Sequence, residues 1–126
     1  MNTSLNPSPT PSAWKIEPVG PLHGDVEVRG SKNAVTKHMV AAMLAEGDSV
    51  IRNIPEVGDV KITAEILESL GATVNVENHV ATISPGAGSD PTVPLRFSGL
   101  NRIPILLLGP LLHRLGEAYV PMVGGD

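Results

Sequence analysis

The 126-residue sequence contains no cysteine, no long apolar run and no excess of basic residues. The absence of cysteine excludes disulfide bonds. The most apolar stretch, residues 103–112, is interrupted by two prolines and a glycine, and it falls far short of the roughly 20 residues that a membrane-spanning helix needs. Nine Lys and Arg against 13 Asp and Glu give a net charge of -4, which does not fit nucleic acid or an anionic membrane as partner. We therefore expect neither partner.

The first 13 residues, MNTSLNPSPTPSA, are rich in Pro, Ser, Thr and Asn and offer almost nothing to bury. Such a composition predicts a disordered tail over residues 1–13. The stretch also lacks the charged start and apolar core of a secretory signal, so we expect a cytoplasmic protein. The folded sequence should begin near Trp14, with Trp14 as a packing residue, and continue to residue 126.

The spacing of apolar residues predicts a β-α-β-α-β-β unit over about residues 24–86. Glycines at 47 and 71 end the two expected helices, and Asp59 is a plausible N-terminal cap for the second. Glu77 and Asn78 form the expected tight turn between the last two strands. The expected strands are residues 26–29, 48–54, 73–77 and 79–84, and the expected helices are 31–46 and 59–70.

A Gly- and Pro-rich loop then precedes a second pattern over about residues 93–126, with a strand at 95–98, a helix at 101–115 and a strand at 117–122. Gly30 and Gly47 bracket the first helix, and Gly99 and Gly116 bracket the later one at the same separation. This spacing predicts an internal repeat offset by 69 residues, with the second unit cut off halfway. The alternative is that any two strand-helix-strand segments look alike. The predicted fold class is α/β (α+β).

Lys32 and Asn33 stand where the first strand gives way to a helix, in the stretch RGSKNAVTKH. A helix N-terminus presents unpaired N–H groups and partial positive charge, so a lysine in the first turn favours a bound phosphate or carboxylate. In the repeat register Asn33 falls opposite Arg102, which also stands at an expected helix start. The alternatives are a solvated turn lysine and an ordinary surface arginine. The Gly-x-x-x-x-Gly-Lys-Ser/Thr phosphate loop is absent.

Four histidines, at positions 23, 38, 79 and 113, are scattered without the spacing of a ligand set. No His-x-x-x-His pair is present. We therefore expect no metal site.

Four motifs carry a resemblance to a known family: GSKNA at 30–34, NIPEVGDV at 53–60, ILESLGATV at 66–74 and LGPLLHRLGEAYVPMVGGD at 108–126. Together with Arg102, seven residues before Gly109, they resemble the enolpyruvyl transferases. The resemblance implies an inside-out α/β fold of two similar domains, each built from three β-α-β-α-β-β units, with the substrates in the cleft between them. It covers only about the first one and a half of six units, so we expect the chain to need the C-terminal part of the same enzyme and to be inactive alone.

The resemblance implies transfer of the enolpyruvyl group from phosphoenolpyruvate to a sugar hydroxyl of UDP-N-acetylglucosamine, without a metal or cofactor. Lys32 and Arg102 would bind phosphoenolpyruvate, since cations stabilise the developing charge and a guanidinium suits a carboxylate or phosphate. Asn33 would hydrogen-bond the sugar. Lys32 and Asp126 are the expected catalytic residues.

Asp126 stands where many family members have a cysteine that is linked to proton donation. To act as an acid near neutrality, an aspartate needs burial or a neighbouring anion. The alternative is a solvated residue beside two glycines. Two other functions remain open: a shikimate-pathway enolpyruvyl transferase, whose motif continues with Ser and Arg after the lysine, and a non-catalytic remnant or binding module.

Overall fold

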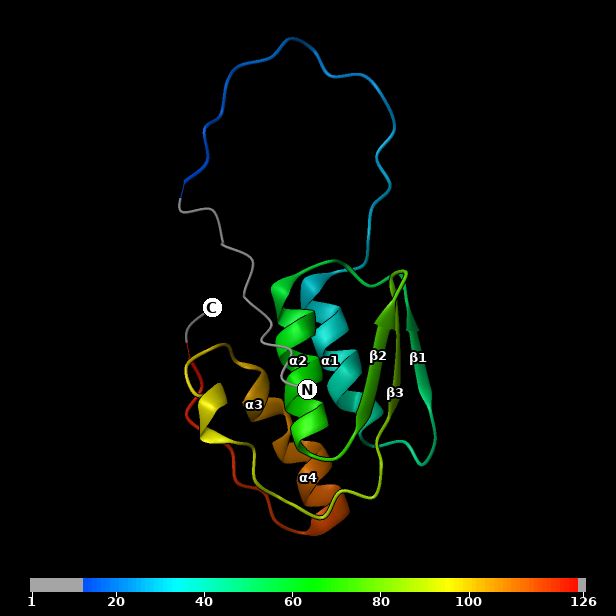
Figure 1. Ribbon diagram of the computed structural model, residues 1–126, viewed down its shortest axis with the longest axis vertical. Coiled ribbons are helices and arrows are strands. Elements are labelled where there is room, and N and C mark those ends of the chain that lie inside the picture. Colours follow the sequence, from blue (N-terminus) through cyan, green and yellow to red (C-terminus); the bar gives the residue numbers. More distant parts are fainter. Residues whose placement is uncertain (1–12, 125–126) are drawn as a thin grey trace, which may run out of the picture.

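The structure is a computed structural model that describes residues 13–124. It mixes helices with one small sheet (Figure 1), in agreement with the predicted α/β class. The predicted tail lies outside the described residues except for Ala13. In chain order the elements are α1 (Lys32–Ala42), β1 (Ser49–Arg52), α2 (Gly58–Ser69), β2 (Thr73–Glu77), β3 (Val80–Ser84), the 3-10 helix η1 (Leu95–Phe97), α3 (Ile103–Leu106) and α4 (Leu108–Leu115).

The sheet is antiparallel with strand order β1-β3-β2, and α1 and α2 cover one face of it (Figure 1). Its central strand β3 buries alternate residues, because successive side chains point to opposite faces. The side chains that fill the space between helices and sheet are fully buried and apolar: Met39, Ile66, Leu67 and Ile83. The bounds of α1, α2 and the three strands lie close to the ranges that the sequence predicts.

The predicted first strand, residues 26–29, is wrong. Residues 13–29 form no helix or strand and arc away from the folded body (Figure 1). Trp14 is 82% exposed, so the prediction that it packs near the folded start is wrong as well. A strand exists only when a neighbouring backbone takes its hydrogen bonds, and no strand lies beside this segment. In the described residues the regular structure begins at α1.

The second unit also departs from the prediction. The expected strand over 95–98 is replaced by the 3-10 helix η1, which ends at Phe97, and the expected helix over 101–115 is divided into α3 and α4. Pro110 has no N–H with which to continue the i to i-4 hydrogen bonds across the division. The expected strand at 117–122 is reduced to one parallel bridge between Thr92 and Tyr119.

The β2–β3 turn lies one residue later than predicted. Asn78 and His79, rather than Glu77 and Asn78, are its central residues, and both have positive φ. Two-residue hairpins favour turns with positive φ at both central residues, because the twist of such a turn matches the twist of the two strands it joins. The His79 backbone and ring both contact Ile54, since His79 accepts from the Ile54 amide at 3.0 Å and its Nδ1 lies 3.1 Å from the Ile54 carbonyl.

One backbone contact recurs at the predicted offset of 69 residues. The amide of Gly30 donates to the carbonyl of Asn53, and the amide of Gly99 donates to the carbonyl of Met122. Gly99 and Met122 each stand 69 residues after their counterparts. The helix ends differ, because Gly116 has positive φ and caps α4, whereas Gly47 has no positive φ.

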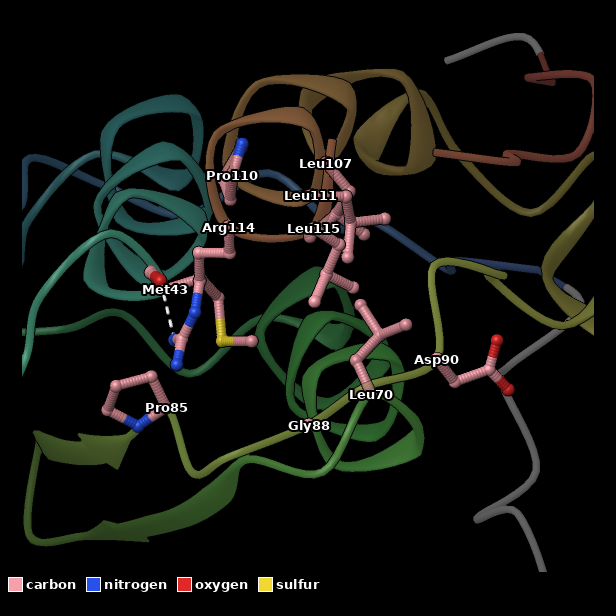
Figure 2. A pocket seen from close by; sticks show the side chains of 10 residues that line it. All are labelled: Met43, Leu70, Pro85, Gly88, Asp90, Leu107, Pro110, Leu111, Arg114 and Leu115. Carbon is pink, nitrogen blue, oxygen red and sulfur yellow. Dashed lines mark hydrogen bonds between the residues drawn. The ribbon is translucent and has the colours of Figure 1, made fainter. Parts of the chain in front are cut away.

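The second unit packs on the first through α4 (Figure 2). Leucine side chains of α4 and of the residue before it point toward Leu70 at the end of α2. Arg114 lies at the edge of this junction and donates to the carbonyls of Met43 at 2.9 Å and Gly86 at 2.7 Å. The space left between the units measures only about 10 Å³, about the size of one water molecule. The junction is therefore packed structure rather than a ligand site.

Among residues 13–124, no helix has both the length and the apolar character that crossing a membrane requires.

Candidate functional site

A larger pocket of about 380 Å³ lies where the start of α1 faces the start of α3. Lys32 and Asn33 come from the first unit and Arg102 from the second, and all three line it. The structure thus brings these three sequence-predicted residues together at one pocket. Their roles stay predictions. The other lining residues are Thr36, Lys37, Asp59, Leu100, Asn101, Ile103, Ile105 and Leu106.

Lys32 is placed by the way that α1 begins. Ser31 is the N-cap residue with an extended backbone, and its side chain makes no capping hydrogen bond. The first turn of α1 contains no acidic residue. The first amides of α1 and the Lys32 side chain thus belong to the same end of the helix, which carries partial positive charge. This end of α1 has the chemistry that attracts an anion.

Asp59 is a site residue that sequence reasoning missed. The sequence suggested a helix cap, but Val57 is the N-cap residue of α2 and Asp59 lies within its first turn. The Asp59 carboxylate lies 3.1 Å from the Lys32 ammonium through one oxygen, and its other oxygen accepts from the Asn101 amide at 3.2 Å. The motif NIPEVGDV contains this aspartate, but nothing in the motif itself indicates that its side chain reaches Lys32.

Asn101 is the second residue that sequence reasoning missed. It is buried, and its side-chain oxygen accepts from the Ile103 amide at 3.0 Å, at the start of α3. Its backbone carbonyl accepts from the amide of Gly124 at 3.2 Å. Asn101 therefore connects Asp59 to the last residue that the structure describes.

Arg102 precedes a much shorter helix than the one that Lys32 begins. It is the N-cap residue of α3, which has only four residues, so its place in the pocket owes little to a helix dipole. Lys37 adds a third cation, with its ammonium 3.0 Å from the Asn33 carbonyl. Three cations and one carboxylate among the lining residues give the pocket a formal charge of +2. A multiply charged anion suits such a pocket.

Asp126 lies outside the described residues, and the structure tests nothing about its role. Gly124 is the nearest described residue to it along the chain. In the part of the chain that the structure covers, no three His, Asp or Glu side chains converge as a metal site would require.

The comparisons with known proteins agree on one family. A family model described as EPSP synthase (3-phosphoshikimate 1-carboxyvinyltransferase) matches residues 16–126. A protein of Chlamydia pneumoniae named UDP-N-acetylglucosamine 1-carboxyvinyltransferase is 49% identical over 110 residues, which cover 85% of this chain and 24% of that protein. A Mycobacterium tuberculosis protein of the same name is 43% identical over 107 residues, covering 83% of this chain and 25% of that protein.

Among solved structures, the enolpyruvyl transferase NikO from Streptomyces tendae matches with a TM-score of 0.67 and 24% identity. The match covers 74% of this chain and 22% of that one, and it supports the fold. The chain spans about a quarter of the length of the curated relatives it matches.

Proposed function

The chain belongs to the EPSP synthase family of enolpyruvyl transferases, and we propose that it is the N-terminal part of an enzyme that acts on UDP-N-acetylglucosamine. The enzyme transfers the enolpyruvyl group of phosphoenolpyruvate to the 3′-hydroxyl of the sugar. The observation that carries the proposal is the cationic pocket that Lys32, Asn33 and Arg102 line together. The names of the relatives that are 49% and 43% identical support the choice of sugar.

In the proposed reaction, the sugar hydroxyl loses its proton and attacks C2 of phosphoenolpyruvate while C3 takes up a proton, which gives a tetrahedral ketal. Phosphate then leaves C2, and C3 loses a proton to restore the double bond. Lys32 and Arg102 bind the phosphate and carboxylate of phosphoenolpyruvate and stabilise the negative charge of the transition state. Asn33, beside Lys32 in the first turn of α1, hydrogen-bonds the sugar.

Asp126 is the proposed proton donor to C3. An aspartate normally titrates near 3.9, so it is protonated at neutral pH only where its surroundings disfavour the carboxylate. Bound phosphoenolpyruvate supplies negative charge that acts in this direction. No metal or cofactor takes part in the proposal. We also propose that the enzyme is cytoplasmic. The C-terminal part of the enzyme supplies the rest of the cleft.

The test is a composite enzyme, in which this chain is joined to the remaining three quarters of the Chlamydia pneumoniae relative. Phosphate release from phosphoenolpyruvate is measured with UDP-N-acetylglucosamine and, separately, with shikimate 3-phosphate. We expect release only with the sugar nucleotide. We expect Lys32→Ala to lower kcat/KM by about 100-fold or more. Lys61→Ala removes a lysine of α2 that lies outside the pocket and should leave the rate unchanged.

Release only with shikimate 3-phosphate would favour the shikimate-pathway alternative. Absence of release with both acceptors, from a composite that folds as the relative does, would favour the non-catalytic alternative.

A further inference from the structure

We propose that Asp59 is a positioning residue that fixes the Lys32 ammonium and, through Asn101, the segment that leads to Asp126. The inference rests on the proposed function, because it assigns Asp59 a task at the phosphoenolpyruvate site. Asp59 itself does not touch the reacting atoms in this proposal. It acts through two side chains that come from different units of the repeat.

The Asp59 carboxylate is well placed to hold Lys32. Its backbone is part of the first turn of α2, and its own carbonyl accepts from the Thr63 hydroxyl at 2.6 Å. The Asp59 side chain is 23% exposed, whereas that of Lys32 is 55% exposed. A half-exposed lysine has many rotamers, and a fixed carboxylate 3.1 Å from its ammonium selects among them. An ammonium has three donors, so one contact orients it without using them all.

The second Asp59 oxygen reaches the other unit. It accepts from Asn101, 42 residues away in sequence, at 3.2 Å. The Asn101 carbonyl in turn accepts from the amide of Gly124. Gly124 is followed directly by Gly125 and Asp126. One carboxylate thus connects the cation proposed to bind substrate with the segment that carries the proposed proton donor.

The negative charge of Asp59 allows a positioning role to be distinguished from a purely electrostatic effect on substrate binding. Asp59 is the one carboxylate among the described lining residues, and it lowers the formal charge of the pocket to +2. A carboxylate opposes the binding of phosphoenolpyruvate by ordinary Coulomb repulsion. If Asp59 only competed with substrate for Lys32, its neutralisation would improve binding and leave kcat unchanged. If it positions Lys32, its neutralisation lowers kcat even though the pocket becomes more positive.

The first experiment does not require an enzymatically active protein. Hydrogen exchange of the Gly124 amide is measured by NMR in the 126-residue chain, with Asp59→Ala compared with Asp59→Asn. We expect exchange to become about fivefold or more faster in Asp59→Ala, because Asn101 loses its acceptor. Asp59→Asn keeps an oxygen for Asn101 and should retain the protection. Asp48→Ala is the matched control, since Asp48 accepts from Ser84 at 2.5 Å beyond the opposite end of α1.

The amides of β3 report whether each variant is folded. Unchanged exchange at Gly124 in a folded Asp59→Ala chain would overturn the link through Asn101. If Asp59→Ala does not fold, Asn101→Asp is measured in its place, because it removes the donor to Asp59 and keeps the side-chain oxygen that accepts from the Ile103 amide.

The second experiment uses the composite enzyme. We expect Asp59→Asn to lower kcat about tenfold, because a displaced catalytic group is costly, while KM for phosphoenolpyruvate does not rise. Asp48→Asn should match the unsubstituted enzyme. An unchanged kcat, or a lower KM with unchanged kcat, would overturn the positioning role. A folded but inactive unsubstituted composite would refute the proposed function instead, and the exchange at Gly124 would still decide whether Asp59 and Asn101 hold this segment.

Discussion

Gly30 lies so close to Asn53 that a β-carbon at position 30 would come within 2.6 Å of the Asn53 carbonyl oxygen. The two residues are joined by the hydrogen bond from the Gly30 amide, at 2.9 Å. This contact holds the residue before Ser31 against the end of β1 and so sets where α1 begins. The glycine of the GSKNA motif is therefore required by the backbone that approaches it.

We expect Gly30→Ala to lower the free energy of unfolding by about 1–3 kcal/mol, because the Asn53 backbone must move to admit the methyl group. Gly47→Ala is the matched control. Position 47 has open space around its β-carbon and no positive φ, so alanine there should be neutral or stabilise by up to about 1 kcal/mol. Urea unfolding of both variants checks the prediction, and equal stabilities would contradict the close approach at Gly30.

The junction between the two units depends on Leu107, which is fully buried. We expect Leu107→Ala to lower the free energy of unfolding by about 2–5 kcal/mol, since it leaves a cavity between α4 and the first unit. Leu112→Ala removes the same atoms from a residue that is 51% exposed, and it should cost about 0.5 kcal/mol or less. Comparable losses in the two variants would show that the units do not pack as Figure 2 shows.

Trypsin should cut the chain first after Lys15 and Arg29. Both lie in the segment without helix or strand, and the Lys15 side chain is 86% exposed. Sites within α2, such as Lys61, should be cut later because a helix must open before a protease can bind it. Mass spectrometry of a digestion time course identifies the products. Protection at Arg29 that lasts as long as protection at Lys61 would indicate that residues 26–29 pair as the sequence pattern predicted.

The 126-residue chain alone should release no phosphate from phosphoenolpyruvate and UDP-N-acetylglucosamine. Its pocket is formed by one and a half units, and transition-state binding requires groups on all sides of the reacting atoms. The assay is the one used for the composite enzyme, at equal protein concentration. Turnover above background by the chain alone would show that activity needs no residues from the C-terminal part of the enzyme.

Asp126 should make the composite enzyme resistant to an epoxide inhibitor such as fosfomycin, which by family resemblance alkylates a cysteine at this position. A thiolate is a strong nucleophile and a carboxylate is a much weaker one. We therefore expect Asp126→Cys to become sensitive, in a time course of inactivation of both forms. Equal and irreversible inactivation of the two would show that residue 126 does not occupy the reactive position.

The sequence by itself determined the parts of this protein whose information is local. The apolar spacing within α1 and α2 buries one side of each helix. The strands β2 and β3 follow from their composition, although the turn between them lies one residue later than predicted. The repeat was predicted because the glycines recur at a fixed offset. Lys32 and Arg102 could be singled out because charge at the start of an expected helix is a local feature.

Only the tertiary structure decided what depends on a partner far away in the chain. Residues 26–29 alternate as a strand does, and residues 117–122 were also expected to form a strand. Strand formation needs a neighbouring backbone, and the described residues give the first segment none and the second a single bridge. The contact between Asp59 and Asn101 joins positions 42 residues apart. No local pattern encodes that distance, because it arises from how the two units pack. The charge arrangement around Lys32 is therefore a property of the fold rather than of the motif.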